Sequence, residues 1–218
     1  NLHIHAGRLD MKQIYSQLTQ IRPVCVLDAT HPYADEVTKN IKEACQTAGF
    51  PYMRILRENT DMTENVTGSA KAHIRVADSM REAVDLLNDK PYLEKNILLT
   101  TGSKHLPDYT KIQDYQNRAY LRLLPSPEML QKAVDTGFLP AHLIAMQGPF
   151  SQELNVALIK QSGIGVLVTK QSGKSGGFEE KISAAEQTGT DVIVIKRPKQ
   201  EDGKNLSEAE AELKKLMT

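Results

Sequence analysis

Four short segments of this sequence gather residues that can bind anions, and each segment directly follows an apolar run. They lie at residues 28–33, 100–104, 147–151 and 169–177, and together they are rich in lysine, serine, threonine and glycine. Lysines supply positive charge, hydroxyl groups donate hydrogen bonds, and glycines let a ligand approach the backbone amides. The pattern predicts a protein that binds an anionic ligand, but these residue types alone do not define a reaction.

The first segment places Asp28, Thr30, His31 and Tyr33 between an apolar run and the start of an expected helix. The N-terminus of a helix presents unpaired amides to an anion, so Thr30, His31 and Pro32 are candidate ligand-binding residues. In the alternative interpretation, Thr30 only caps the helix and His31 has no function. The number of polar groups in one turn favours a functional role.

The second and third segments give weaker signals. Thr101, Gly102 and Lys104 can hold a phosphate or a carboxylate, but an ordinary helix cap with a solvated lysine explains them equally well. In the third segment, Gly148 lets a ligand approach the backbone beside Gln147. The alternative there is a tight turn whose serine caps the next helix.

The fourth segment is the sharpest local signal. Its candidate anion-binding residues are Thr169, Lys170, Ser172 and Gly173, with Lys181 in the helix that follows. The run Gly173-Lys174-Ser175 suggests a Walker motif, but the glycine required five residues before Gly-Lys is replaced by Val168, which excludes a P-loop NTPase. A flexible loop without function is the alternative.

Composition excludes several classes of function. Of the 218 residues, 27 are basic and 27 acidic, and tryptophan is absent, so general nucleic-acid binding is not expected. No apolar run reaches the roughly 18 residues of a membrane span. The sequence contains no HExxH and no Cys/His metal set, so no metal site is predicted. It also contains no complete GxGxxG, the motif typical of dinucleotide binding. Without a signal peptide the chain is expected to be cytoplasmic.

Short apolar strands alternate with amphipathic helices along the chain, which predicts an α/β fold with mostly parallel sheets. Strands are expected at residues 24–27, 52–56, 97–99, 120–124, 143–146, 166–168 and 192–195, and the first of these reads as buried on both faces. Helices are expected between the strands and at 206–217. We interpret the chain as two Rossmann-like lobes with a ligand cleft between them, because ligands bind beyond the carboxyl ends of such strands.

The polar stretch at residues 58–70 reads as a linker or loop. The N-terminal Rossmann-like lobe is therefore expected at residues 1–70 and the C-terminal Rossmann-like lobe at 71–218. Residues 2–7 read as a strand already inside a fold, so we expect the first βα unit of the N-terminal lobe to be missing.

The sequence resembles the precorrin-6A reductase family of cobalamin biosynthesis. The combination of Asp-Ala-Thr-His-Pro with Gln-Gly-Pro-Phe and Thr-Lys-x-Ser-Gly carries most of the specificity. The similar stretches keep their order and spacing over nearly the whole chain, and they are residues 26–34, 52–57, 99–104, 147–151 and 168–173, with Gly176, Gly177, Lys181, Arg197 and Pro198. The glycine-rich opening turn of the family is not in this sequence.

This resemblance implies a reductase that transfers a hydride from NADPH or NADH to a carbon–carbon double bond of precorrin-6A or cobalt-precorrin-6A. The implied partner is a small tetrapyrrole substrate, and the chain is expected as a monomer or small homo-oligomer. The implied cofactor-binding residues are Thr30, His31, Pro32, Thr101 and Gly102. The implied substrate-binding residues are Lys104, Gln147, Gly148, Thr169, Lys170, Ser172, Gly173 and Lys181.

His31 is the candidate catalytic residue, because histidine titrates near neutral pH and can give a proton to the reduced ring. It can instead orient the nicotinamide or bind a substrate carboxylate, with solvent supplying the proton. A different class of function is also open: a non-catalytic Rossmann-like module that binds a nucleotide or another anion. A tetrapyrrole methyltransferase is less favoured, since its glycine-rich opening is absent.

Overall fold

The computed structural model describes residues 3–30, 34–56, 72–171, 177–196 and 203–216. The chain forms two compact units, and each is treated by itself. One unit comprises Asn1–Asn59 together with Pro198–Thr218, and the other comprises Thr60–Arg197. The expected division at residue 70 placed the C-terminal segment in the second lobe, whereas this segment belongs to the first unit.

The second unit contains a six-stranded, fully parallel sheet in the order β3-β8-β7-β4-β5-β6. The α/β class and the parallel sheet expected from the sequence are therefore present. The strands are β3 (Ile74–Ala77), β4 (Asn96–Leu99), β5 (Ala119–Leu123), β6 (Leu143–Ala145), β7 (Ile164–Lys170) and β8 (Asp191–Ile195). The edge strand β3 was not predicted, because only four residues form it and Arg75 interrupts its apolar pattern.

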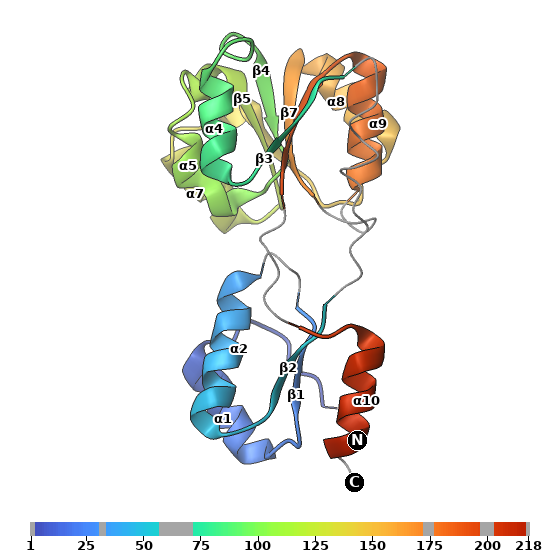
Figure 1. The fold of residues 1–218 in the computed structure, drawn as a ribbon. Coiled ribbons are helices and arrows are strands. Elements are labelled where there is room, and N and C mark those ends of the chain that lie inside the picture. The colour runs from blue at the N-terminus through green and yellow to red at the C-terminus, as the bar shows by residue number, and fades with distance from the viewer. Residues whose placement is uncertain (1–2, 31–33, 57–71, 172–176, 197–202, 217–218) are drawn as a thin grey trace. The chain divides into compact units, whose positions relative to one another are not determined.

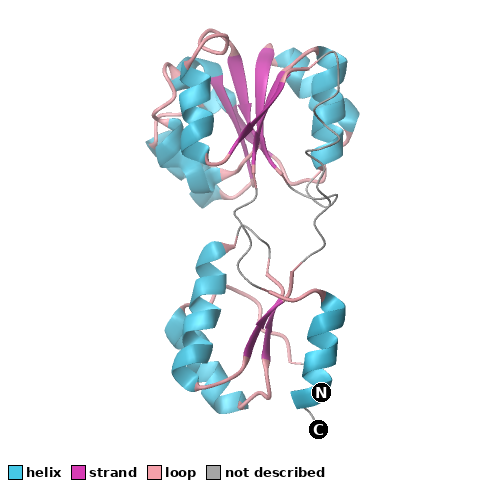
Figure 2. Ribbon diagram, in the orientation of Figure 1, coloured by secondary structure: helices cyan, strands magenta, loops and turns pink. Residues whose placement is uncertain are grey.

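Helices cover both faces of this sheet (Figures 1 and 2). Helices α4, α5 and α7 pack on one face, whereas α8 and α9 pack on the other. The helices of this unit are α4 (Met80–Asn88), α5 (Leu106–Tyr109), α6 (Tyr115–Arg118), α7 (Pro127–Asp135), α8 (Gln152–Gln161) and α9 (Phe178–Thr188), with short 3₁₀ turns η1 (Ser103–His105) and η2 (Pro140–His142).

Side chains of the central strands alternate between the two helical layers. In β4, Ile97 and Leu99 belong to the core beneath α4, α5 and α7, whereas Leu98 belongs to the core beneath α8 and α9. Strands buried on both faces are apolar at every position rather than at alternate positions. This explains why β4, β7 and β8 were visible in the sequence as continuous apolar runs.

The sheet order contains a reversal next to its centre. From β4 the chain proceeds to β5 and β6 on one side, and then returns to β7, which pairs with β4 on the other side. Connections after β4 and β7 therefore lead to opposite faces of the sheet. In open α/β sheets the carboxyl ends of strands at such a reversal are the usual ligand-binding position.

The first unit is smaller and contains one parallel strand pair, β1 (Val26–Asp28) and β2 (Tyr52–Arg54). Helices α1 (Met11–Ile21) and α2 (Asp35–Ala48) lie on one side of the pair, and α10 (Leu206–Leu216) lies on the other (Figure 1). The C-terminal segment joins the pair through Lys204, whose backbone bonds Arg54 O at 2.9 Å and Leu56 N at 2.8 Å. These bonds attach residues distant in sequence to the end of β2.

Two local expectations and one alternative interpretation for this unit were wrong. The strand at 24–27 is not buried on both faces, since Leu27 is 46% exposed. Residues 3–7 do not form a strand. Thr30 does not cap α2, because the cap residue is Ala34, without a side-chain hydrogen bond. Gly49 ends α2, with a left-handed φ of 75°. The expected linker at 58–70 lies outside the described residues.

The position of α10 leads to a testable prediction. Ala209 is 3% exposed, whereas Ala211 on the same helix is exposed. Ala209→Asp would bury a carboxylate without a partner, so we expect a loss of about 2–4 kcal/mol of stability in the first unit. Hydrogen exchange measured by mass spectrometry should then accelerate in peptides from α1 and α2. Ala211→Asp is the matched control, and equal effects of the two variants would contradict the packing of α10.

Candidate functional site

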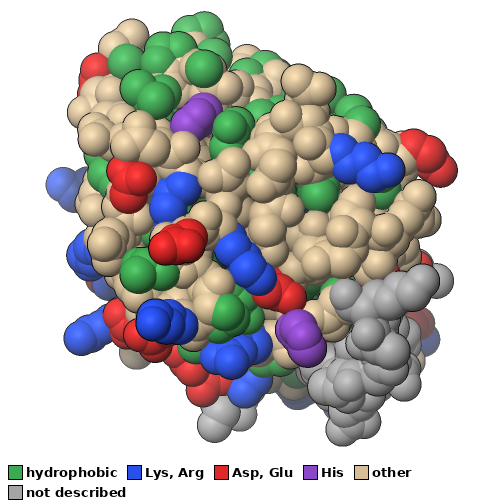
Figure 3. All heavy atoms as spheres, turned by 90° about the horizontal axis from the view of Figure 1, so that it is seen from above, with side chains coloured by type: hydrophobic (Ala, Val, Ile, Leu, Met, Phe, Trp, Pro, Cys, Tyr) green, Lys and Arg blue, Asp and Glu red, His purple; other side chains and the backbone are tan. Residues whose placement is uncertain are grey.

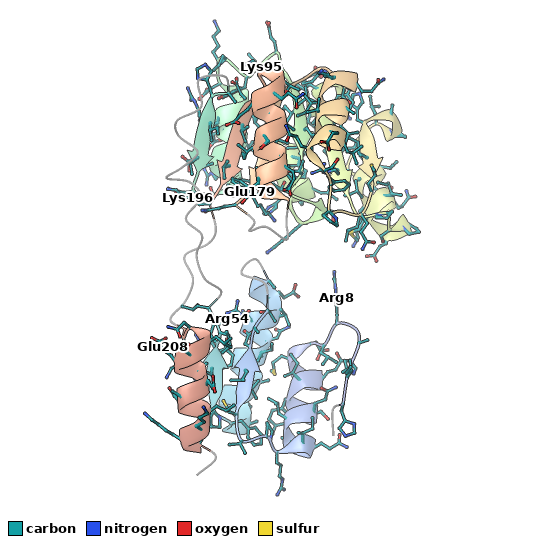
Figure 4. All side chains as sticks on the ribbon, turned by 90° about the vertical axis from the view of Figure 1, so that its right-hand side faces the viewer. Arg8, Arg54, Lys95, Glu179, Lys196 and Glu208 are labelled. Carbon is teal, nitrogen blue, oxygen red and sulfur yellow. The ribbon has the colours of Figure 1, made fainter. Side chains whose placement is uncertain are left out.

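A pocket of about 310 Å³ opens at the carboxyl edge of the six-stranded sheet. Turns that follow β4 and β6, the end of β5, and the first turns of α9 form its walls. The lining residues are Thr100, Gly102, Arg122, Leu123, Leu124, Met146, Gly148, Pro149, Phe150 and Lys181. Figure 4 identifies this edge, because Glu179 and Lys196 lie at one end of the unit and Lys95 at the other. The pocket thus lies where the sheet topology favours ligand binding.

Arg122 is a buried cation in the pocket wall, with 5% of the residue exposed. One of its terminal nitrogens, Nη1, donates to Asn155 Oδ1 at 2.8 Å, and its guanidinium lies 4.1 Å from the centre of the Phe150 ring. Asn155 in turn donates to Ser151 O at 2.8 Å. Burial lowers the pKa of Arg122 to about 10, so the side chain remains charged at neutral pH. These contacts fix the direction of the guanidinium.

Lys181 is the second buried cation of the pocket, with 6% of the residue exposed. Burial and, to a lesser extent, the positive charge of Arg122 lower the pKa of its ammonium to about 8, while Glu180 opposes the shift. The lysine was expected near an anion site, but its sequence position in α9 did not reveal that it is buried. Its pKa makes its charge sensitive to whatever enters the pocket.

The turn after β4 contributes backbone rather than side-chain groups. Thr101 is buried, and its hydroxyl is hydrogen-bonded to the Tyr109 hydroxyl at 2.5 Å. The Tyr109 hydroxyl also donates to Gly102 O at 2.8 Å. Gly102 has a φ of 81°, and a Cβ there would meet no described atom within 4 Å. Thr101 therefore anchors the turn, while Gly102 leaves space for a ligand beside its backbone.

A histidine that sequence analysis did not select, His105, lies beside this turn. Its Nδ1 is 3.2 Å from Asp108 Oδ2, and the charges of Lys170 and Lys104 act on it. Burial and then the two lysines lower the pKa of His105, although Asp108 opposes them. The imidazole is therefore mainly neutral at pH 7. The charge of Lys170, at the end of β7, thus acts on His105 beside the turn that follows the adjacent strand β4.

In the first unit, a buried carboxylate organises the turn that follows β1. Asp28 is 1% exposed and lies 2.6 Å from Arg54 Nη1, while Tyr52 donates to its Oδ2 at 2.9 Å and Thr30 N donates to its Oδ1 at 3.0 Å. Burial by itself raises the pKa of Asp28, but bonds from Thr30 and Tyr52 and the Arg54 charge outweigh this and hold it below the usual value.

Arg54 also fixes Thr30, the last described residue before His31. Its Nη1 donates to Thr30 Oγ1 at 2.7 Å, and its Nη2 donates to Thr30 O at 3.2 Å. The Thr30 hydroxyl is also 2.9 Å from the Thr38 hydroxyl on α2. Two guanidinium nitrogens thus hold the side chain and the carbonyl of one residue. Figure 4 shows Arg54 at the end of its strand.

The structure separates the sequence-predicted residues into groups. Gly102, Gly148 and Lys181 line one pocket, whereas Thr101 and Thr169 are buried. Lys104 and Gln147 are exposed, and Lys170 is half-buried at the end of β7. Thr30 lies in the first unit, within the Arg54 network. The remaining candidates, His31, Pro32, Ser172 and Gly173, lie outside the described residues. The binding roles of all these residues stay predictions.

Two arginines were missed as site residues, Arg122 and Arg54. Arg122 interrupts an otherwise apolar strand, and a lone cation within a buried strand is a signal that charge is needed there. Arg54 is the last residue of β2. In the third segment, Ser151 caps α8 by accepting from Leu154 N, as the alternative interpretation states, while Gly148 and Pro149 line the pocket.

The described residues contain no group of three or more metal-ligating side chains. None of the helices in this described part is long and apolar enough to cross a membrane. On the face drawn in Figure 3, basic and acidic side chains are interspersed rather than gathered by sign. Arg122 and Lys181, by contrast, are buried in the lining of the pocket.

Comparison with known proteins identifies relatives over most of the chain. The sequence model of the family described as precorrin-6x reductase CbiJ/CobK matches residues 1–215. The cobalt-precorrin-6A reductase of Priestia megaterium is 34% identical over 205 residues, which cover 92% of this chain and 75% of that protein. The enzyme of the same name from Salmonella typhimurium is 33% identical over 195 residues, covering 89% of this chain and 71% of that protein.

A solved structure supports the fold. The structure described as CobK precorrin-6A reductase superposes with a TM-score of 0.68 and 24% sequence identity, covering 96% of this chain and 80% of that one. At this identity the similarity shows a common fold. The family match and the two relatives at 33–34% identity confirm the resemblance carried by the residue motifs, and the chain belongs to the precorrin-6x reductase family.

Proposed function

We propose that this chain reduces a carbon–carbon double bond of cobalt-precorrin-6A or precorrin-6A with NADPH or NADH. The observation that carries this proposal, beyond family membership, is the pair of buried cations in the pocket at the carboxyl edge of the sheet. A corrin precursor carries many carboxylates, and a basic pocket attracts them although the chain has no net charge. We propose a cytoplasmic protein, monomeric or a small homo-oligomer.

The cofactor, when bound, supplies the hydride, so the protein must bind, orient and exclude water. The open space beside Gly102 fits a ligand that approaches the backbone, and we assign Thr101 and Gly102 to the cofactor together with Thr30, His31 and Pro32. Because the Thr101 side chain bonds Tyr109, its contribution comes through its backbone. Lys104, Gln147, Gly148, Thr169, Lys170, Ser172, Gly173 and Lys181 are assigned to the substrate.

The direct test follows absorbance of NADPH and NADH during incubation of the protein with cobalt-precorrin-6A and with metal-free precorrin-6A. Oxidation of one nucleotide that requires one tetrapyrrole, with formation of the reduced ring, supports the proposal. Binding of nucleotide and tetrapyrrole without turnover would instead support the alternative, a non-catalytic module.

His31 is the proposed proton donor, and its replacement tests that role. A general acid contributes about 10²–10⁴-fold to the rate. We expect His31→Asn to slow the chemical step by this order while nucleotide affinity is kept. Single-turnover absorbance of the ring, recorded across pH, measures this step. A rate within a few fold of the unmodified protein, with the same pH profile, would remove His31 as the donor.

Arg54 is the proposed positioning residue for the turn that carries His31. Arg54→Lys keeps a positive charge beside Asp28 but cannot bond both oxygens of Thr30. We expect stability to change little, while the single-turnover rate falls roughly ten- to a hundredfold through misplacement of the turn. The exposed Arg81→Lys is the matched control. If Arg54→Lys loses stability but keeps the rate and its pH profile, the bonds from Arg54 to Thr30 only support the fold.

Lys181 gives a prediction that separates function from stability. Its pKa of about 8 in the folded protein lies below its ordinary value of 10.5. The folded state therefore binds this proton more weakly than the unfolded state, which disfavours folding fully below pH 8 and ceases to do so as the pH rises above 10.5. At pH 7 we expect Lys181→Met to stabilise the protein by at most about 3 kcal/mol.

Denaturant titration at pH 7 and pH 9 measures this effect. The gain in the variant should shrink at pH 9, whereas the exposed Lys160→Met should show no gain at either pH. Destabilisation by Lys181→Met at pH 7 would mean that its contacts, rather than its desolvation, dominate.

A further inference from the structure

We infer that Arg122 and Lys181 together form a seat for one carboxylate on a side arm of the macrocyclic substrate. This inference rests on the proposed function for the identity of the ligand. Its physical basis is the pocket itself, which is lined by two cations, one from β5 and one from α9, together with a set of apolar residues. Arg122 was not among the residues that the sequence marked as a site.

The direction of Arg122 is fixed before any ligand arrives. Its Nη1 bonds the neutral amide oxygen of Asn155, and Phe150 packs against its guanidinium. Among the described residues, no carboxylate lies within ion-pair distance of Arg122. A planar guanidinium held in one orientation suits two parallel hydrogen bonds to a carboxylate. The protein thus supports a fixed cation without supplying the matching anion to it.

Lys181 adds a second positive charge to the pocket that Arg122 lines. Each of the two residues is at least nine-tenths buried, and the charge of Arg122 lowers the pKa of Lys181, although Glu180 acts in the opposite direction. Two like charges at low dielectric repel each other, and each also loses hydration. An anion that contacts both cations replaces part of this hydration and offsets the repulsion between them, so a pocket lined by both suits an oxyanion ligand.

The remaining walls distinguish a carboxylate arm from a cofactor phosphate. Leu123, Leu124, Met146 and Pro149 give the pocket an apolar lining beside the two cations. An acetate or propionate arm has methylene groups for these walls and an oxyanion for the cations, whereas a phosphate has no apolar part. The volume of about 310 Å³ is at the lower end of the roughly 300–1,000 Å³ of small-molecule pockets, which suits an arm rather than a whole macrocycle.

The test compares two corrinoid probes that differ in charge: cobyrinic acid, whose side arms end in carboxylates, and its heptamethyl ester. Calorimetric titration of the whole protein gives both dissociation constants, and NADPH is titrated separately. We expect the protein to bind the acid more tightly than the ester. Arg122→Gln, which can still bond Asn155, and Lys181→Met should each weaken acid binding roughly tenfold or more, with ester and NADPH binding within twofold. Lys160→Met is the control and should change none of the three.

Three outcomes would contradict the seat. Equal binding of acid and ester by the unmodified protein would overturn it, and so would variants that leave acid binding unchanged. Weakened NADPH binding with unchanged acid binding would assign the cations to a cofactor phosphate instead. If Arg122→Gln does not fold, Lys181→Met decides alone, since its melting temperature is expected to rise. Failure to turn over cobalt-precorrin-6A, with the acid preference intact, would reject the reductase proposal but not the seat.

Discussion

The structure of the second unit depends on one topological constraint: all six strands are parallel, so every strand ends at the same edge. The groups that end β4, β5, β6 and β7 therefore converge although they are up to about 70 residues apart in sequence. The reversal of strand order between β4 and β7 sends the following helices to opposite faces and leaves space at this edge. The buried cations lie in that space, and the apolar layers on both sides of the sheet exclude water behind them.

In the first unit, the turn at the end of the first strand is held in place by an ion pair rather than by a large apolar core. Its parallel pair is too short to bury a large core, and its apolar cluster centres on Ile14, Leu18, Ala44 and Cys45 between α1 and α2. The turn after β1 is instead held by charge, through Asp28 and Arg54, whose pairing also fixes both oxygens of one threonine. A buried ion pair adds little net stability compared with apolar packing, but it specifies one geometry. That geometry matters where the proposed ligand-binding turn begins.

The sequence predicted the class of the fold and most elements of the second unit because buried strands leave continuous apolar runs. It did not predict β3, which is short and at the sheet edge, or the return of the C-terminal segment to β2, which depends on backbone bonds at Lys204. Site residues were likewise predictable where they form local sequence patterns, and not where they depend on tertiary structure. Glycines and lysines in turns are visible as local clusters, and Gly102, Gly148 and Lys181 do share a pocket. Arg122 comes from inside a strand, where only the tertiary arrangement shows that its charge reaches the pocket.

Burial strengthens the interaction that each of the two cations can make with an anion. An exposed lysine attracts an anion through a high dielectric and keeps most of its own hydration, so each contact contributes little. Lys181 has already lost that hydration during folding, as the direction of its pKa shift indicates. The free-energy cost of this desolvation therefore arises during folding and not during ligand binding. Water also screens these buried charges less than it screens exposed ones. A pocket built in this way binds an anion more strongly than surface lysines of equal charge, and it does so at the expense of the stability of the unliganded protein.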